Sequence, residues 1–173
     1  MSDRRPAFRR YEPSDHDAVH ALHERGLRAA GTWTDPADLP EWVEADMDDI
    51  EGAYLDSGGE FLVADHPNEG LLAMGAFRPL PDETFHDRPA GRTAELKRMR
   101  VDPDHHREGV GSTLLEELER RASAAGFEFV VLDTGVGMDG ARAFYETHGY
   151  AHRGDVTVEH GETLALYGKS LTR

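Results

Sequence analysis

The sequence contains no cysteine, so the chain has no disulfide framework, no thiolate metal site and no cysteine nucleophile. It also lacks any run of about 18 apolar residues, the length that a membrane-spanning helix needs. The first fifteen residues carry charges but no apolar stretch of the kind found in secretion signals. We therefore expect a cytoplasmic protein with no membrane partner.

Basic residues are scarce. Lys and Arg number 19 against 34 Asp and Glu, which gives a formal net charge of −15. Such a charge disfavours nucleic acid and anionic membranes as partners. It suits a cationic partner such as an amine, but the acidic residues are spread along the whole chain. We interpret them as a solvated acidic surface.

The length of 173 residues predicts a single domain over residues 1–173, large enough to bury a core of its own. Hydrophobic spacing and turn residues predict a fold of mixed strands and helices. We expect strands over 7–11, 60–65, 71–78, 92–101 and 127–134, two more within 150–171 that turn at His160 and Gly161, and helices over 14–29, 35–50, 109–125 and 139–148.

Residues 92–134 read as a strand, a helix and a second strand. The last of these is almost continuously apolar, as expected for a parallel strand that is buried on both faces. The intervening helix opens with two glycines, Gly109 and Gly111. Backbone N–H groups at a helix N-terminus carry partial positive charge, and glycine lets a diphosphate approach them closely. The amides from Arg107 to Ser112, with the Arg107 guanidinium, are candidate phosphate donors.

Other phosphate-binding motifs fit this turn poorly. A P-loop requires a lysine directly after its second glycine, and Ser112 stands there. A dinucleotide fingerprint requires a third glycine where Leu114 stands, and it belongs in the first strand-to-helix turn of a chain. The alternative that Gly109 and Gly111 merely make a tight turn stays open.

Three segments in a fixed order carry a resemblance to a known family. His106 to Gly111 fits the pattern (Q/R)-x-x-G-x-(G/A), except that His106 replaces Gln or Arg. Glu95 to Pro103 precedes it, and Ala141 to Tyr150 fits A-x-x-(F/L)-Y-E-x-x-G-(F/Y). Met138 stands where an Asn is often found. These segments resemble the GNAT superfamily of acyl-CoA N-acyltransferases, over nearly the whole chain.

The resemblance implies an α/β (α+β) fold. Its central sheet would have about seven mostly antiparallel strands, splayed between the fourth and fifth, with helices on both faces. It also implies acetyl-CoA as co-substrate and no metal. The residues that match the cofactor-binding positions are Met99, Arg100, Val101, His106, Arg107, Glu108, Gly109, Val110, Gly111 and Ser112. A backbone N–H of Met99 would stabilise the oxyanion.

Two side chains match catalytic positions of the family. Glu95 stands where some members carry a glutamate that removes a proton from the amine, directly or through water. It could equally be an ordinary strand carboxylate or pair with Lys97 or Arg98. Tyr145 matches the tyrosine that protonates the departing thiolate, and its alternative is a core aromatic beside Phe144.

The resemblance therefore implies an N-acetyltransferase that acts on a primary amine of a small molecule or a protein. The alternative is an acyl-CoA-binding sensor with little or no turnover. A homodimer stays open. His16, His20 and His23 share one helical face, which we interpret as a solvated stripe and not as a metal site.

Overall fold

The predicted strands assemble into one seven-stranded sheet in the computed structural model, which describes residues 4–159 and 161–172. The strand order is β1-β2-β3-β4-β5-β7-β6, and every neighbouring pair is antiparallel except β4 and β5. This confirms the expected fold class. The strands are β1 (Ala7–Arg10), β2 (Glu60–His66), β3 (Gly70–Pro79), β4 (Thr93–Val101), β5 (Phe129–Gly135), β6 (Ala151–Thr157) and β7 (Thr163–Ser170).

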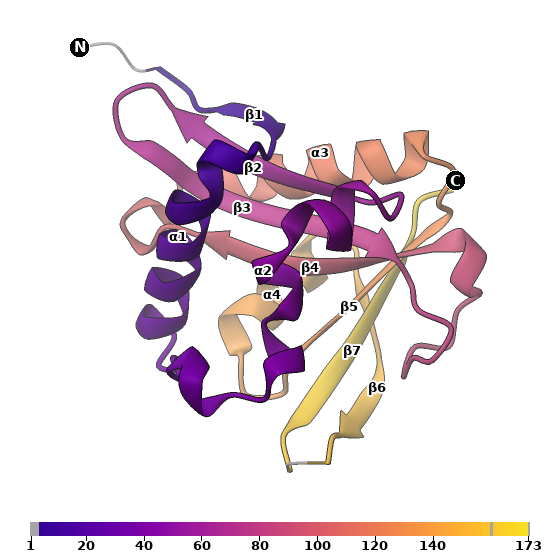
Figure 1. The fold of residues 1–173 in the computed structure, drawn as a ribbon. Coiled ribbons are helices and arrows are strands. Elements are labelled where there is room, and N and C mark those ends of the chain that lie inside the picture. Colours follow the sequence, from indigo (N-terminus) through magenta and orange to yellow (C-terminus); the bar gives the residue numbers. More distant parts are fainter. Residues whose placement is uncertain (1–3, 160, 173) are drawn as a thin grey trace.

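Helices cover both faces of the sheet (Figure 1). On one face lie α1 (His16–Ala29) and the short α2 (Ala45–Asp48). On the other lie α3 (Val110–Ala124) and α4 (Asp139–Thr147). Each helix turns its apolar stripe toward the strands, so the sheet is sandwiched between two layers.

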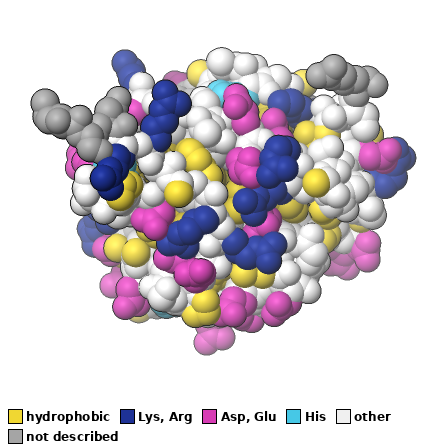
Figure 2. Space-filling view, turned by 90° about the horizontal axis from the view of Figure 1, so that it is seen from above, with side chains coloured by type: hydrophobic (Ala, Val, Ile, Leu, Met, Phe, Trp, Pro, Cys, Tyr) yellow, Lys and Arg dark blue, Asp and Glu magenta, His cyan; other side chains and the backbone are white. Residues whose placement is uncertain are grey.

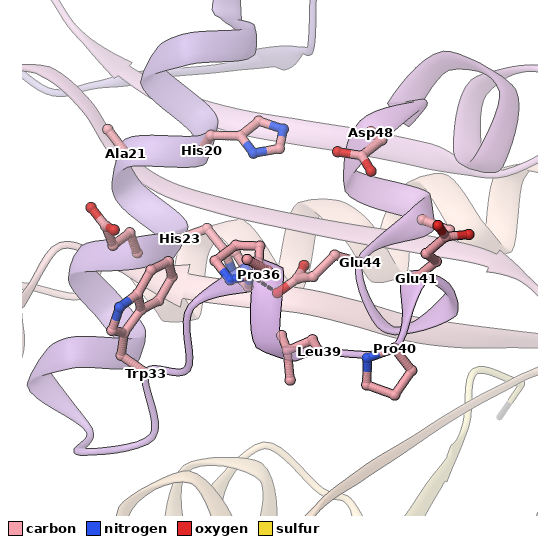
Figure 3. A pocket seen from close by; sticks show the side chains of 13 residues that line it. His20, Ala21, His23, Trp33, Pro36, Leu39, Pro40, Glu41, Glu44 and Asp48 are labelled. Carbon is pink, nitrogen blue, oxygen red and sulfur yellow. Dashed lines mark hydrogen bonds and ion pairs between the residues drawn. The ribbon is translucent and has the colours of Figure 1, made fainter.

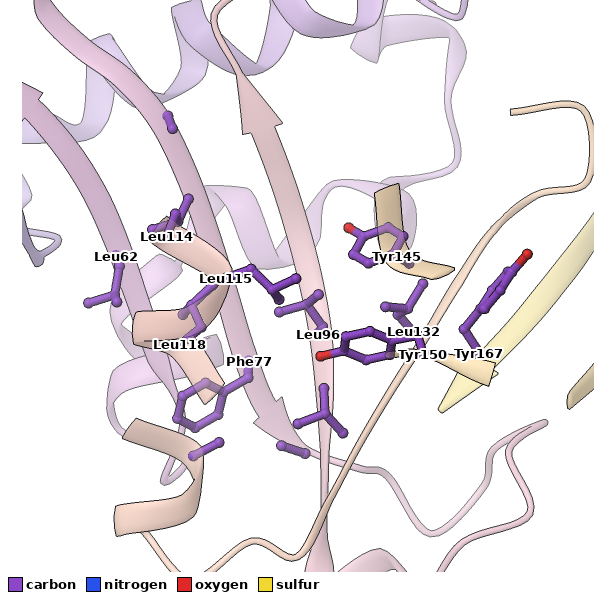
Figure 4. Packing of buried hydrophobic residues seen from close by; sticks show 14 of the residues in the cluster. Leu62, Phe77, Leu96, Leu114, Leu115, Leu118, Leu132, Tyr145, Tyr150 and Tyr167 are labelled. Atoms are coloured by element: carbon purple, nitrogen blue, oxygen red, sulfur yellow. The ribbon is translucent and has the colours of Figure 1, made fainter. Parts of the chain in front are cut away.

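Two apolar clusters hold these layers together. The cluster under α1 includes Val19, Leu22 and Met47, all fully buried against β2 and β3. The cluster under α3 and α4, part of which Figure 4 shows, includes Leu114, Leu115 and Leu118 from α3. The core therefore lies on both sides of β2, β3 and β4, and the middle of the sheet is rigidly packed.

The helix expected over residues 35–50 is wrong as a single element. The segment consists of two short 3-10 turns, Pro36–Asp38 and Glu41–Val43, followed by α2 and a π-helical turn over Glu51–Leu55. Pro40 explains the break, because it disfavours a helical backbone at Leu39, which is extended at φ −99° and ψ 149°. The apolar residues whose spacing suggested one helix instead belong to several short turns that pack against the same core.

The start of the first helix also differs from the prediction. We expected Ser14 to cap it, but α1 begins at His16 after a 3-10 turn over Pro13–Asp15. The N-cap of this turn is Glu12, and the Asp15 carboxylate completes a capping box by accepting a hydrogen bond of 2.8 Å from the Glu12 amide. The turn predicted at His160 and Gly161 includes His160, which lies outside the described residues.

Strands β4 and β5 separate soon after they meet. Their pairing covers only Thr93–Glu95 with Phe129–Val131, and the two strands then diverge toward their C-terminal ends (Figure 1). The predicted splay is confirmed. From Lys97 to Val101 the backbone of β4 has no neighbouring strand on the β5 side, so its polar groups along that edge face an opening in the sheet.

A β-bulge marks the same part of β4. Its register with β3 steps from Ala76 opposite Lys97 to Met74 opposite Arg100, so β4 contains one extra residue there. Arg98 takes the strained position, with a φ of 60°. Bulges bend a strand and redirect its side chains. Here the bulge brings Arg98 and Arg100 to the α1 face, while Met99 and Val101 pack against the core beneath α3.

Charges of both signs share the face seen in Figure 2, where Lys and Arg side chains lie among Asp and Glu. In the interior, the buried Glu60 carboxylate accepts hydrogen bonds from Arg10 at 2.8 Å and from Arg121 at 3.2 Å. None of the helices within residues 4–159 and 161–172 is long and apolar enough to cross a membrane.

Candidate functional site

The separation of β4 from β5 opens a cleft of about 1350 Å³ on the α1 face of the sheet. Its walls come from α1, the segment around α2, the loop between β3 and β4, the strands β4 and β5, and α4. The polar side chains in it on which the argument depends are Glu95, Lys97, Arg98, Arg100, Asp133 and Tyr145.

An ion pair fixes the bulge at the bottom of this cleft. The Arg98 guanidinium binds both carboxylate oxygens of Asp46 at 2.6 and 2.9 Å, and it donates to the Val43 carbonyl at 2.8 Å. Tyr54 donates a third hydrogen bond to Asp46, at 2.5 Å. Burial opposes ionisation of Asp46, but Arg98 and Tyr54 outweigh it and lower its pKa to about 2.

The candidate base Glu95 is buried on β4 beside the cleft, with 9% of its side chain exposed. Its carboxylate accepts a hydrogen bond of 2.8 Å from Arg78 on β3. The alternative partners considered from the sequence are therefore not used, since Arg98 binds Asp46 instead. One side of Glu95 is held by an ion pair, while the residue still lines the cleft.

Two residues that the sequence analysis missed adjoin Glu95. His86, from the loop between β3 and β4, and Asp133, on β5, place ligand atoms within 4.8 Å of each other and of the Glu95 carboxylate. His86 is buried, and its Nε2 has no hydrogen-bond partner within residues 4–159 and 161–172, with Asp133 Oδ2 at 3.8 Å. Burial raises the pKa of Asp133, but His86 and Lys97 outweigh it and lower that pKa.

Tyr145 reaches the cleft from α4. Its ring packs edge-on against Phe144 and Tyr150, and its hydroxyl oxygen lies on the side of the ring that faces β4 (Figure 4). Burial raises the pKa of this phenol, and the nearby Arg100 guanidinium offsets part of the rise. The residue is thus both a core aromatic and a part of the cleft wall, so the two readings of the sequence do not exclude each other.

The predicted phosphate cradle lies at the N-terminus of α3, beyond the end of β4. Gly109 caps the helix in the left-handed region, at a φ of 84°, which is costly for any residue with a Cβ. The first turn contains no acidic side chain. Among the described residues, the amides from Arg107 to Ser112 have no protein acceptor. This end of the helix therefore presents free donors and partial positive charge.

Gly111 also permits close packing within the protein. A Cβ at this position would lie 3.0 Å from Val101 Cγ2 and 3.7 Å from the Phe144 ring. The glycine thus allows the first turn of α3 to pack closely on β4 and α4. Substitutions at Gly109 or Gly111 would disturb the backbone as well as any bound anion.

The other residues predicted to bind the cofactor surround this turn. Arg107 adopts a left-handed φ of 65°. Glu108 accepts from His105 at 2.7 Å, and His106 Nε2 lies 3.2 Å from the Val101 carbonyl. Val110 is buried in the core beneath α3 and supports the turn. The structure thus gathers the backbone from His106 to Ser112 at one corner of the fold.

A second hollow of about 840 Å³ lies between α1 and the segment before α2 (Figure 3). His23 is buried there and hydrogen-bonds Glu44 at 3.1 Å, while His20 Nε2 contacts the Met47 carbonyl at 2.8 Å. His16 stacks on His20. The expected solvated stripe is therefore wrong for His23, because Pro40 turns the following segment back over this end of α1.

The profile of the acetyltransferase (GNAT) family matches residues 27–150. This range covers more than half of the chain and contains the cradle, the bulge and both candidate catalytic side chains. The chain belongs to this family. GNAT acetyltransferases use acetyl-CoA as the acyl donor.

Among curated proteins, the chain is 28% identical to human N-acetyltransferase 8 over 122 residues, covering 70% of this chain and 51% of that protein. It is 32% identical over 117 residues to the mouse N-acetyltransferase family 8 member 5, covering 67% of this chain and 49% of that protein. The chain thus spans about half the length of the curated relatives it matches.

Solved structures share the fold over almost the whole chain. A GNAT acetyltransferase from Staphylococcus aureus superposes with a TM-score of 0.78 at 17% identity, covering 96% of this chain and 99% of that one. The Salmonella typhimurium protein yncA, solved with its cofactor acetyl-CoA, gives 0.73 at 17% identity, covering 96% and 94%. At these identities the likeness establishes the fold alone.

Replacing Asp46 by Asn tests the ion pair that fixes the bulge. We expect a loss of about 2–4 kcal/mol in the free energy of unfolding at pH 7, because the buried Arg98 keeps a weaker partner. Asp46 has a folded pKa of about 2, below the unfolded value of about 3.9. Its contribution is therefore complete above about pH 4 and declines as the pH falls toward 2.

Urea unfolding of both proteins from pH 7 down to pH 3 measures this difference. The exposed neighbour Asp48 provides the control, and Asp48→Asn should change stability by no more than about 0.5 kcal/mol. A difference between wild type and Asp46→Asn that stayed constant down to pH 3 would show that the Asp46 charge does not hold this region.

Proposed function

We propose that the protein is an N-acetyltransferase that transfers the acetyl group of acetyl-CoA to a primary amine of a small molecule or a protein. The observation that carries the proposal is the position of one cleft. It runs along the unpaired edge of β4 from Glu95 to Arg100, and the side chains of both Glu95 and Tyr145 line it. The free amides at the N-terminus of α3 lie beyond the end of the same strand.

The donor end is assigned to the corner formed by β4 and α3. The pyrophosphate of coenzyme A carries negative charge, which suits the free amides from Arg107 to Ser112 and the Arg107 guanidinium. The backbone of Met99, Arg100 and Val101 would hold the pantetheine arm, because this edge of β4 lacks a strand partner. The Met99 amide is then the candidate donor to the oxyanion.

On the acceptor side, Glu95 takes the proton. An amine with a pKa near 10.4 is mostly protonated at neutral pH and must lose a proton before it can attack. Glu95 lines the cleft and accepts that proton directly or through water. Asp133, 28% exposed beside it, adds a second negative charge that favours an approaching ammonium group.

Tyr145 acts at the leaving group. As the new C–N bond forms and the C–S bond breaks, the electron pair of that bond goes to sulfur, and the phenol donates its proton to the thiolate. The attacking nitrogen loses its second proton to solvent, which leaves a neutral amide. Solvent then reprotonates the Tyr145 phenolate, and Glu95 releases the proton that it took from the ammonium group. Burial raises the pKa of Tyr145, so the phenol stays protonated until the thiolate forms, although it is a weaker acid than a free phenol. The charge of Arg100 lowers this pKa and offsets part of that effect.

The alternative is an acyl-CoA sensor that uses the same cradle without turnover. Such a protein needs the α3 terminus but neither Glu95 nor Tyr145 in the cleft. Their joint presence in the lining of one cleft favours catalysis. Steady turnover of acetyl-CoA with an amine separates the two readings.

The cradle is best tested at Ser112, in the first turn of α3, where no glycine is disturbed. Ser112→Asp places a carboxylate beside the proposed pyrophosphate, so we expect the affinity for coenzyme A to fall by about tenfold or more. The same charge favours the helix N-terminus, so thermal stability should be unchanged or slightly higher. Calorimetric titration with acetyl-CoA measures the first effect. Ser123 is exposed near the other end of α3, so Ser123→Asp is the control and should bind acetyl-CoA with normal affinity. Equal affinities for both variants would show that coenzyme A does not bind at the N-terminus of α3.

Glu95→Gln keeps the shape of the side chain and removes the base. We expect turnover at neutral pH to fall by about 10²-fold or more and to recover partly as the pH rises toward the pKa of the acceptor. A pH–rate profile of thiol release measures both effects. Glu116→Gln, exposed on α3, should behave like the wild type. If Glu95→Gln kept full turnover at pH 7, another group would have to be the base.

Tyr145→Phe removes the hydroxyl and preserves the ring. We expect turnover to fall by about 10²- to 10⁴-fold while the affinity for acetyl-CoA changes little. The matched control is Tyr150→Phe, which removes another buried hydroxyl that donates to Glu119 at 2.8 Å. That control should lose stability but keep its turnover per folded molecule. Near-normal turnover of Tyr145→Phe would show that the residue serves packing alone.

A further inference from the structure

The side chain of Arg100 has no acidic partner. It lines the cleft on the α1 face of β4, and its only hydrogen bond recorded within the described part of the chain goes to the Met99 carbonyl at 3.0 Å. Its Nε is buried and unpartnered. No carboxylate of the described residues lies within ion-pair distance. A half-buried guanidinium in this state is costly, since most of its five N–H groups have no acceptor among the described residues.

The neighbouring arginines on the same face of the sheet each form an ion pair with a carboxylate. Arg98 binds Asp46 on both oxygens, and Arg78 binds Glu95. Glu44 acts on Arg100 from a distance, but that carboxylate already pairs with His23 and Arg98. Burial and the like charge of Arg98 both lower the pKa of Arg100. The fold therefore holds one cationic side chain at this wall without the anion that it needs.

The backbone around Arg100 is arranged to admit this side chain. Gly26 faces it from the middle of α1, where a Cβ would lie 3.0 Å from the Arg100 Cδ. Glycine within a helix costs stability relative to alanine. Its presence here gives the arginine room to extend into the cleft beneath the helix.

Arg100 is also close to the proposed chemistry. Its charge acts on Tyr145, whose pKa it lowers against the effect of burial. An anion bound to Arg100 would therefore lie near the thioester and not at a remote end of the cleft. Because the amine must reach the same thioester, an acceptor that carries both groups has to carry them a few bonds apart.

The apolar residues that line the cleft indicate that the acceptor also carries an apolar group. Trp42 and Phe85 both face this cleft, and they are exposed by 69% and 57%, respectively. Leu27 adds a further apolar wall from α1. Large apolar side chains exposed around a cleft are typical of sites that bind an apolar group.

We infer that Arg100 binds the carboxylate of the acceptor, and that the acceptor is a small amine with a nearby carboxylate, such as an α-amino acid with an apolar side chain. The inference rests on the proposed acetyl transfer. The planar guanidinium fits a carboxylate with two parallel hydrogen bonds. The α-amino group then lies a few bonds from the carboxylate, within reach of the thioester, with its proton taken by Glu95 through water.

Lys97 is the competing cation for this role. It also lines the cleft, but its charge already lowers the pKa of Asp46 and of Asp133, so it lies among carboxylates. By contrast, Arg100 has no carboxylate within ion-pair distance among the described residues. Replacing each residue by glutamine distinguishes them, because only the variant that lacks the carboxylate ligand should lose the preference for acids over plain amines.

The experiment compares amino acids with their own decarboxylated or amidated counterparts, using thiol release from acetyl-CoA. L-phenylalanine is paired with phenethylamine and L-phenylalaninamide, L-leucine with isopentylamine, and L-methionine with 3-(methylthio)propylamine. For at least one set, the wild type should show a kcat/KM about 10-fold or more higher for the acid. In Arg100→Gln that ratio should fall by about 10- to 100-fold, chiefly through a higher KM for the acid.

Three controls accompany this variant. Arg100→Lys should restore part of the ratio, because the charge remains while the two parallel hydrogen bonds are lost. Arg25→Gln, an exposed arginine of α1 that pairs with Asp102, should leave the ratio unchanged. Calorimetry with acetyl-CoA confirms that each variant keeps the folded donor site.

Other outcomes would contradict the inference, and the first two point to a different role for Lys97 or Arg100. If Lys97→Gln abolished the preference and Arg100→Gln kept it, Lys97 would be the carboxylate ligand. If Arg100→Gln slowed acids and plain amines equally, the guanidinium would act on the thioester. If the wild type acetylated amines without any preference for acids, the inference would be wrong and the proposed function would stand. If the wild type did not bind acetyl-CoA, or bound it without acetylating any acceptor, both the inference and the proposed function would be contradicted.

Discussion

The ion pair between Arg98 and Asp46 is the interaction on which the geometry of the cleft depends. A strand accommodates one extra residue only if that residue can be held in an unusual conformation, and Arg98 is held at a φ of 60° by two hydrogen bonds to a carboxylate of low pKa. The bulge sends Met99 toward the core and Arg100 toward α1. The segment around α2, which supplies Asp46, is thereby tied to the centre of the sheet.

The cleft separates charges in a way that suits acyl transfer. Beyond the end of β4, the first turn of α3 offers free amides and no acidic side chain, in a chain whose formal net charge is −15. On the β5 side, Glu95 and Asp133 place negative charge where an amine would approach. Between these two regions, the unpaired edge of β4 and the Tyr145 side chain line the cleft in which we propose that the thioester binds. On this proposal, an anionic donor and a basic acceptor are drawn to different parts of the same face.

Much of the fold and half of the site could be predicted from the sequence, because both depend on local patterns. The apolar strand over 127–134 and the glycines before α3 have spacings that a reader can recognise. Arg78 and His86 could not be assigned, since strand register and the β3–β4 loop bring them to Glu95. Asp133 did leave a signal, a charge within an otherwise apolar strand. Pro40 likewise signalled the broken helix. The single domain, the cytoplasmic location and a homodimer remain predictions or open questions.

The proposed mechanism requires the Met99 amide, on the unpaired edge of β4, to donate a hydrogen bond to the carbonyl of the thioester. Nuclear magnetic resonance of the ¹⁵N-labelled protein tests it directly, with the amide of Met99 followed during titration with coenzyme A and with acetyl-CoA. The account predicts that the amides from Arg107 to Ser112 shift with both ligands, whereas the Met99 amide shifts strongly downfield only with the acetylated one, because only that ligand supplies a carbonyl acceptor. A Met99 amide that responded equally to both ligands, or to neither, would contradict the account.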